Sequence, residues 1–398
     1  MREVKIMNLF ENRFNEDVEK IGISAIREFD ELCNQIEGII KLTLGEPDFT
    51  TPGHIKEAGK LAIDNNATRY THASGVLELR QAACQWLNDK YQLNYTPEET
   101  IVTHGATEGL SIAFKAILNP GDKVLIPSPF FTLYQSMIIL YGGIPVHINT
   151  EPNQFVLSPE LLEQALAEHG DDVKAIVLNY PTNPTGITWD DEEAQAIANI
   201  LKDKPIFIVS DEVYSEFVYG DNHVSIATYL PEQTIVVQSL SKSHSMTGWR
   251  VGFNFAPLMI TNQMNKVHQN YITNATSISQ HAGIAALTDG KDDALIMKEA
   301  YIKRRDYIYE RMTKMGFEII KPNGAFYLFA KIPAGYPQDS FEFGRELATK
   351  AQVALIPGSA FGTGGENYVR LSYAASDELI TEAMDRMEKF MNEYPKQD

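Results

Sequence analysis

The chain has 398 residues, of which 44% are hydrophobic and 22% charged, a composition typical of folded globular proteins and not of disordered or fibrous ones. Its 34 Lys and Arg residues against 53 Asp and Glu residues give a net charge of −19. This acidic balance argues against a nucleic-acid binder, which needs a basic surface. The length predicts two domains, one of them assembled from both ends of the chain.

The first residues are charged and lack the apolar segment of a signal peptide. No apolar run approaches the roughly 20 residues that a membrane-spanning helix needs. The two cysteines, Cys33 and Cys84, form no CxxC pair, so neither a disulfide framework nor a cysteine-rich zinc site is expected. These features predict a soluble, cytoplasmic protein that contacts neither membranes nor nucleic acids.

From about residue 98 to 240, short apolar runs alternate with longer segments of helical spacing. Such runs, apolar on both faces, are typical of parallel strands buried between helices. They cover residues 101–102, 124–126, 175–178, 206–209 and 235–237. Between them, Ser158-Pro159 and Gly170 predict the start and end of one helix, and Asp190 with Glu193 predicts the capping box of another.

Two further helices are indicated by apolar spacing. The segment after residue 101 predicts a helix whose buried face is formed by Leu110, Ala113, Phe114 and Ile117. A long charged segment, about 293–315 and closed by Gly316, predicts a helix whose buried face is formed by Leu295, Ile302, Ile308 and Met312. Beyond it, separated strands and helices favour a smaller α+β domain, onto which the first forty-odd residues are expected to pack.

Polar or aromatic clusters follow each of the five apolar runs, at residues 104–109, 127–131, 179–186, 210–214 and 239–242. Ligands of open α/β sheets bind at the carboxyl ends of the strands, so these clusters predict a ligand site. The common nucleotide and metal motifs are absent from the sequence: no GxGxxG follows a strand, and there is no Walker loop and no HExxH. A metal or nucleotide enzyme is therefore not favoured, and no metal ligands are predicted.

The type of ligand site that the sequence still indicates is an anion-binding site built without a P-loop. Its expected donors are backbone N–H groups at a helix start or polar side chains, from Gly105, Ala106, Thr107, Ser239, Ser241 and Arg250. Lys242 lies among them, and Asp211 follows a very apolar strand, where a lone carboxylate needs a cation. An acid, an anion site, a lysine and an aromatic side chain, Phe131, together match one organic cofactor, pyridoxal phosphate.

Four motifs then identify a family resemblance: NYPTNPTG (179–186), SDEVY (210–214), SLSKSHSMTGWR (239–250) and VRLSYA (369–374). In this order they resemble the pyridoxal-phosphate aminotransferases of class I/II, fold type I, along about residues 42–370. The resemblance implies an α/β fold. A large domain, 46–290, would hold a mostly parallel seven-stranded sheet between helices, and a smaller α+β domain, 291–398, would be joined by the N-terminal segment 1–45.

The resemblance also implies roles for individual residues. Lys242 would bind the cofactor aldehyde and later move the substrate Cα proton, and Asp211 would keep the ring nitrogen protonated. Tyr214 and Asn183 would hydrogen-bond the phenolic oxygen. Phe131 and Val213 would cover the two ring faces. The anion-site donors above, with Tyr70 of a neighbouring subunit, would bind the phosphate. Arg370, with Gly45 and Asn183, would bind the substrate α-carboxylate. The use of Tyr70 implies a homodimer.

Taken singly, several of these residues have ordinary explanations. Asp211 suits a helix N-cap, Asn183-Pro184 a turn, Phe131 the core, and Tyr70 plain packing. The combination in one order is what favours the functional interpretation.

The substrate is less sharply predicted. Thr107 stands where one subgroup of related aspartate aminotransferases has a lysine for the distal carboxylate, which weakens the case for strict aspartate use. SLSKSHSMTGWR and SISQ resemble the bacterial aminotransferase A group, so transamination between N-acetyl-LL-diaminopimelate and 2-oxoglutarate or glutamate is the favoured hypothesis. Aspartate or aromatic amino acids are the alternative.

Two other classes share the fold. Carbon–sulfur β-lyases tend to read NPHNPxGR, where this chain has Thr182 and Ile187 in place of the histidine and the arginine. A pyridoxal-phosphate-binding regulator remains open, although residues 1–41 are too short and too acidic for a helix-turn-helix module.

Overall fold

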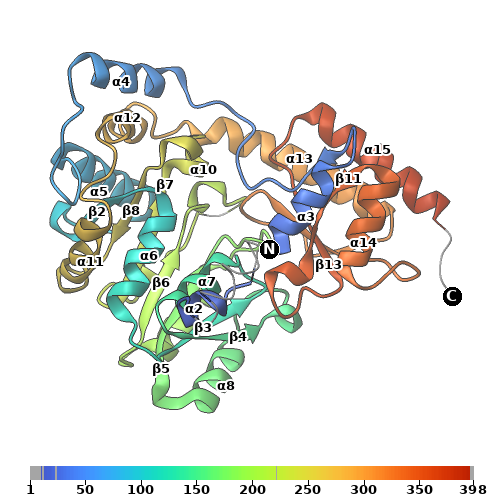
Figure 1. Cartoon of the computed structure of the whole chain (residues 1–398), viewed down its shortest axis with the longest axis horizontal. Helices are drawn as coiled ribbons and strands as arrows, with labels where there is room; N and C mark the ends of the chain where they lie inside the picture. Colours follow the sequence, from blue (N-terminus) through green and yellow to red (C-terminus); the bar gives the residue numbers. More distant parts are fainter. Residues whose placement is uncertain (1–9, 11–12, 23–24, 221, 395–398) are drawn as a thin grey trace.

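The computed structural model describes residues 10, 13–22, 25–220 and 222–394 (Figure 1). Its largest sheet has seven strands in the order β2-β8-β7-β6-β5-β3-β4, and only β8 runs antiparallel to its neighbours. The strands are β2 Thr100–Thr103, β3 Lys123–Ser128, β4 Ile144–Asn149, β5 Val173–Asn179, β6 Phe207–Asp211, β7 Thr234–Ser239 and β8 Gly252–Phe255. The predicted mostly parallel seven-stranded sheet is confirmed.

Helices lie around this sheet, either on its faces or, as for the first of them, on another helix (Figure 1). They are α4 Gly53–Asp64, α5 Leu77–Tyr91, α6 Gly105–Ile117, α7 Leu133–Leu140, α8 Pro159–His169, α9 Asp191–Leu201, α10 Leu240–Ser243, α11 Leu258–Tyr271 and α12 Ser277–Leu287. Successive strand residues enter different parts of the core: Val124 and Ile126 pack in the same cluster as residues of α6, whereas Leu125 packs with residues of α8 and α9. Burial on both faces explains why the strands are uninterrupted apolar runs.

The local signals in the sequence act as expected. Ser158 caps α8 by accepting from the Leu161 N–H, and α8 ends at Gly170 with φ +59. The Asp190–Glu193 capping box at the start of α9 is present with both bonds at 2.9 Å. Sequence spacing did not reveal β4 and β8, because β4 is partly exposed and β8 reads GFNF, with Asn254 between its two phenylalanines.

A second, four-stranded antiparallel sheet has the order β12-β13-β10-β9. Its strands and the helices of this region are β9 Glu318–Ile319, β10 Tyr327–Lys331, β12 Ile356–Pro357, β13 Tyr368–Ser372, α13 Ala294–Lys314, α14 Ser340–Glu346 and α15 Asp377–Glu393. The long helix α13 was predicted, but its expected buried face was only half right. Ile308 and Met312 are buried, whereas Leu295 is 49% exposed and Ile302 is only partly buried; Met297 and Tyr301 take inner positions instead.

The N-terminal elements are α2 Glu16–Glu19, α3 Ala25–Asn34 and β1 Ile40–Lys41. Strand β1 pairs in parallel with β11, Val353–Ala354, and Phe29 of α3 packs edge-on against Phe341 of α14. Figure 1 shows α3 beside these late elements, whereas α2 lies near α7. The exact limits 1–45, 46–290 and 291–398 stay a prediction, and residues 1–9 lie outside the described part.

Short helical turns complete the chain: η1 Pro97–Glu99, η2 Glu151–Asn153, η3 Gly170–Asp172, η4 Ser215–Phe217, η5 Ile226–Thr228, η6 Thr247–Trp249, η7 Leu347–Ala351 and η8 Gly358–Phe361. Among the described residues, no helix combines the length and apolar character needed to cross a membrane.

Candidate active site

A cavity of about 440 Å³ lies where β5, β6 and β7 end, facing the second sheet. Its lining is Ile26, Arg27, Asp30, Thr43, Leu44, Gly45, Ala106, Thr107, Leu110, Phe131, Leu133, Tyr134, Asn179, Asn183, Asp211, Val213, Tyr214, Ser239, Ser241, Lys242, Arg250, Tyr327, Ile356 and Arg370. Every site residue predicted from the sequence is among them except Gly105 and Tyr70. The five clusters that follow the strands therefore do contribute to one site.

Lys242 is carried by α10, a one-turn helix that begins directly after β7. Ser239 caps this helix by accepting from the Ser241 N–H at 3.1 Å. The Lys242 Nζ donates to the backbone oxygen of Gly45. The pKa of Lys242 is lowered to about 8, mainly by burial; Glu46 opposes the decrease and Arg250 contributes to it. A substantial fraction of this amine is therefore neutral near physiological pH, as a nucleophile requires.

Asp211 is the last residue of β6 and is only 4% exposed. Tyr134 of α7 donates to its carboxylate at 2.7 Å, and the Asn179 side chain donates to its backbone oxygen at 2.9 Å. Burial raises the pKa of Asp211 to about 6, although the bond from Tyr134 counteracts the shift. A cation beside this carboxylate would relieve the unfavourable burial of its charge.

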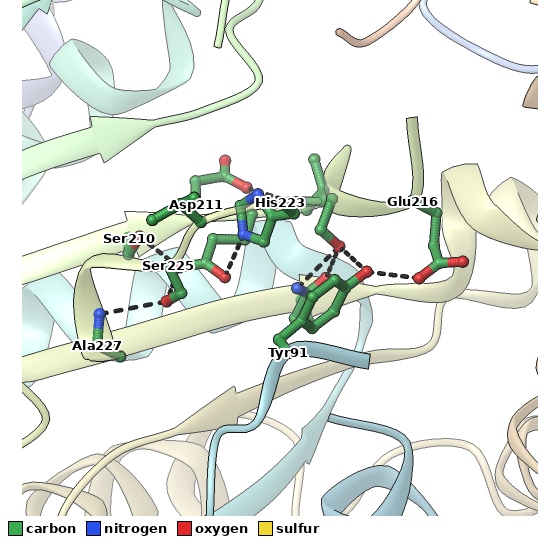
Figure 2. Close-up of polar contacts among 12 residues, drawn as sticks. Tyr91, Ser210, Asp211, Glu216, His223, Ser225 and Ala227 are labelled. Carbon is green, nitrogen blue, oxygen red and sulfur yellow. Dashed lines mark hydrogen bonds and ion pairs between the residues drawn. The ribbon is translucent and has the colours of Figure 1, made fainter. Parts of the chain in front are cut away.

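Next to Asp211 lies a buried polar network that includes Ser210, Ser225 and His223 (Figure 2). The Glu212 carboxylate accepts from Ser210 at 2.7 Å and from Ser225 at 2.6 Å, and it lies 2.9 Å from His223 Nε2. The ring of Tyr91 from α5 packs edge-on against His223 at 5.1 Å. Because neighbouring residues of a strand point to opposite sides, this network fixes the end of β6 while Asp211 faces the cavity.

Gly105 opens α6 with φ +70, a conformation that favours glycine. A Cβ at this position would stand 2.5 Å from Arg250 Nη2, so the missing side chain lets the arginine approach the helix start. A Cβ on Gly252 would likewise stand 2.8 Å from the Ala106 backbone nitrogen. The first turn of α6 and Arg250 thus lie close together, an arrangement suited to an anion.

Two serine hydroxyls join this anion cradle. Ser239 Oγ donates to Ser241 Oγ at 2.8 Å and lies 2.9 Å from the backbone oxygen of Val251, and both serines line the cavity. Thr107 also lines it and is exposed. All of the predicted phosphate donors except Tyr70 therefore line the cavity or lie directly beside it.

Arg370 of β13 is 4% exposed. Its Nη1 donates to Asn183 Oδ1 at 2.9 Å and its Nη2 to the Thr43 backbone oxygen at 2.6 Å, while the buried Nε has no partner among the described residues. The guanidinium also lies over the Tyr327 ring, 4.6 Å from its centroid. Burial lowers the pKa of Arg370. A buried guanidinium that has a free donor and no carboxylate partner in the described part of the chain is suited to bind a carboxylate ligand.

Tyr214, Tyr327 and Gly45 form a tight group beside Lys242. The hydroxyls of Tyr214 and Tyr327 are 2.8 Å apart, and both side chains are buried. A Cβ on Gly45 would stand 2.6 Å from the Tyr327 hydroxyl, so residue 45 has to be glycine for this pair to keep its place. Phe131 and Val213 line the same cavity as partly buried apolar side chains.

Tyr70 lies outside this cavity and is 86% exposed. Its predicted contact with the phosphate of a neighbouring subunit stays a prediction. Within the described part of the chain, no group of three His, Cys, Asp or Glu side chains is arranged to hold a metal ion.

Several lining residues had no role in the sequence-based prediction. Tyr134 and Asn179 support Asp211, Thr43 accepts from Arg370, and Arg27 and Asp30 reach the cavity from α3. Asn179 directly follows an apolar run and could have been noticed on that ground. The others carry no signal of their own, because their approach to the site depends on tertiary packing.

The chain is similar to known proteins along nearly its whole length. A model of the family "Aminotransferase class I and II" matches residues 37–387. The chain is 49% identical to a Bacillus subtilis protein named "Probable N-acetyl-LL-diaminopimelate aminotransferase", over 96% of both chains. It is 43% identical to an aspartate aminotransferase of Pyrococcus horikoshii, over 92% of this chain and 94% of that one. A solved double mutant of the Thermus thermophilus aspartate aminotransferase superposes with a TM-score of 0.90 at 34% identity, covering 94% of this chain and 99% of that chain.

Proposed function

The chain belongs to the class I and II aminotransferase family, and on this premise we propose that it moves the amino group of an L-amino acid to a 2-oxo acid with pyridoxal 5′-phosphate as cofactor. The observation that carries the proposal is the convergence of four chemical features on one cavity: a lysine of lowered pKa, a buried carboxylate, an anion cradle and a buried arginine. Each corresponds to one part of the cofactor or the substrate.

The donor set fits this cofactor. The first turn of α6, the two serine hydroxyls and Arg250 suit a phosphate, and Gly105 supplies the space that a side chain would fill. Asp211, buried with Tyr134 as its donor, suits a protonated ring nitrogen. When bound, pyridoxal 5′-phosphate would supply an aldehyde for the amino group and a conjugated ring that takes up electron density from the substrate Cα.

The protein's own residues would divide the remaining tasks. Lys242 Nζ would hold the aldehyde until an amino acid replaces it, and would then move the proton of the substrate Cα. Asp211 would keep a proton on the ring nitrogen, and Tyr214 with Asn183 would hydrogen-bond the phenolic oxygen. Phe131 and Val213 would cover the two ring faces and exclude water.

Arg370 would bind the substrate α-carboxylate. Its bond from Nη1 to Asn183 orients the guanidinium, and its free Nε supports a forked contact with a ligand. Gly45 would complete this subsite, since a larger residue would displace Tyr327.

For the specific substrate, we favour transamination of N-acetyl-LL-diaminopimelate with 2-oxoglutarate or glutamate as partner, a step of lysine biosynthesis. The 49% identity to the similarly named Bacillus subtilis protein supports this choice. Aspartate is the second candidate, supported by the 43% identity to the Pyrococcus horikoshii enzyme. Thr107 speaks against a strict aspartate enzyme because it brings no positive charge.

The test begins with borohydride reduction of the protein after incubation with pyridoxal 5′-phosphate, followed by peptide mapping. The label is expected on Lys242 and is expected to vanish in Lys242→Ala, whereas Lys60→Ala, which removes a lysine that is 67% exposed, keeps it. A label at another lysine would refute the proposed mechanism.

A donor panel with 2-oxoglutarate then identifies the reaction. Formation of glutamate from N-acetyl-LL-diaminopimelate faster than from aspartate or phenylalanine would support the favoured substrate. Release of pyruvate and ammonia from cystathionine without any glutamate would instead identify a β-lyase.

A further inference from the structure

Helix α3 forms part of the cavity wall, and it brings a positive charge there. Ile26, Arg27 and Asp30 of this helix line the cavity. The cavity has three other basic lining residues, Lys242, Arg250 and Arg370, and each already corresponds to the aldehyde, the phosphate or the α-carboxylate. Arg27 is the fourth basic lining residue, and neither the aldehyde, the phosphate nor the α-carboxylate requires it.

The negative charge next to Arg27, the carboxylate of Asp30, is already paired with a cation other than Arg27. Asp30, one helical turn further along α3, receives an ion pair from Lys41 at 2.8 Å. Among the described residues, no carboxylate lies within ion-pair distance of Arg27, and its side chain is exposed. Within the described part of the chain, the Arg27 guanidinium is thus unpaired where it lines the cavity, in a chain whose net charge of −19 gives anions no general attraction.

The wall that holds Arg27 also holds Arg370. Helix α3 packs on β12, and Ile356 of β12 is paired with Arg370 of β13 while lining the cavity itself. Lys242 and Arg250 belong to the opposite side, built on β7 and its connection to β8. A substrate whose α-carboxylate is held by Arg370 would therefore extend its remaining carbons along the wall that ends at α3.

We propose that Arg27 binds the distal carboxylate of the substrate, and that it selects dicarboxylic substrates of the glutamate and 2-oxoglutarate class. The inference rests on the proposed aminotransferase function and deepens it. Arginine suits this task because its planar fork can hold a carboxylate through two hydrogen bonds. A long acylated amino acid with a second carboxylate at its far end would use the same contact.

The kinetic test compares 2-oxoglutarate with 2-oxobutyrate, which lacks the distal carboxylate, in the holoenzyme. Arg27→Gln is expected to raise KM for 2-oxoglutarate by about 10- to 100-fold, the loss typical of a charged hydrogen bond. The value of kcat/KM for 2-oxobutyrate is expected to stay within about twofold, and Arg27→Lys to recover part of the 2-oxoglutarate affinity. Arg345→Gln, an exposed arginine of α14 outside the cavity, is the control for the change in net charge.

A binding test without turnover uses glutarate and butyrate as inert ligands, titrated into the holoenzyme by calorimetry. Arg27→Gln is expected to weaken glutarate binding and leave butyrate binding unchanged. Three results would overturn the role of Arg27. In Arg27→Gln, the affinity could fall equally for glutarate and butyrate, or the affinity for glutarate could stay unchanged. The wild-type protein could also accept 2-oxobutyrate but not 2-oxoglutarate. A wild-type protein that transaminates no 2-oxo acid would refute the proposed function instead, and the glutarate titration would still decide about Arg27.

Discussion

Lys242 differs from a surface lysine because its ammonium form loses hydration in the cavity, where its Nζ donates to the backbone oxygen of Gly45. The lowered pKa has a direct kinetic meaning, because only the neutral amine attacks an aldehyde. With a pKa of about 8, roughly a tenth of the amine is neutral at pH 7, far more than for an ordinary lysine.

We therefore expect the rate of pyridoxal 5′-phosphate association with the apoprotein to rise about tenfold between pH 7 and 9 and then to level off. Stopped-flow absorbance at several pH values measures this association rate. The same measurement with Nα-acetyllysine amide in place of the protein serves as the reference, because it shows how titration of the cofactor alone changes the rate. A rate that keeps climbing to pH 10.5 would contradict the lowered pKa.

In Asp211, burial raises the pKa instead of lowering it, and this shift destabilises the folded protein at neutral pH. Burial raises its pKa to about 6 in the folded protein, so the native state binds this proton more tightly than the unfolded chain does. The resulting destabilisation is fully present above pH 6 and diminishes as the pH falls toward the ordinary aspartate value.

Asp211→Asn is accordingly expected to stabilise the apoprotein by up to about 3 kcal/mol at pH 7.5 and by about half as much at pH 5. Urea unfolding at the two pH values measures the difference, and the exposed Asp64→Asn serves as the control. The same variant is expected to lose transaminase activity, because the amide cannot hold the ring nitrogen protonated. A stabilisation that is independent of pH would contradict the assigned cause.

At the scale of elements, β6 is held at its end by two different sets of contacts. Asp211 lines the cavity and accepts from Tyr134, while Glu212 contacts Ser210, Ser225 and His223. Glu212 is 1% exposed, so its three hydrogen-bonding partners have no water to replace it.

Glu212→Gln is expected to lower the free energy of unfolding by about 1–3 kcal/mol, because a neutral amide accepts fewer of these bonds and leaves buried donors unpaired. Urea unfolding near pH 7 measures the change. Glu232→Gln, an exposed glutamate just before β7, provides the comparison. Equal midpoints for the two variants would mean that the network contributes little to stability.

The elements also show what could be predicted from the sequence. Apolar runs and caps are local signals, so five strands, both ends of α8 and the start of α9 followed from them. The motifs around Lys242, Asp211 and Asn183 led to the cavity for the same reason. Tyr134 could not be assigned, because its acceptor lies 77 positions later in the chain. Arg27 could not be assigned either, because its direction depends on the packing of Phe29 against Phe341.

At the scale of the whole molecule, Tyr70 is the residue whose predicted role requires a second subunit. It is 86% exposed and lies outside the cavity of its own chain. If it serves the phosphate of a neighbouring subunit, sedimentation should show a dimer, and two defective variants should complement each other.

Lys242→Ala and Tyr70→Ala are each expected to be nearly inactive as homodimers. In a hybrid dimer, one site combines an intact Lys242 with an intact Tyr70 from the other chain. Refolding the two variants together is therefore expected to restore activity, which a coupled glutamate assay would detect. Mixtures that remain as inactive as the separate variants would contradict the shared site.

Lys242 and Arg250 both belong to the link between the antiparallel neighbours β7 and β8, and the Leu240 N–H joins the two ends of that link by donating to the Val251 backbone oxygen at 3.1 Å. Arg370 belongs to the other sheet. A sliding of one sheet over the other would therefore change the reach from Lys242 to Arg370 but not the spacing from Lys242 to Arg250. Such a change in the relative position of the two sheets would therefore alter the proposed substrate end of the cavity and leave the proposed cofactor end unchanged.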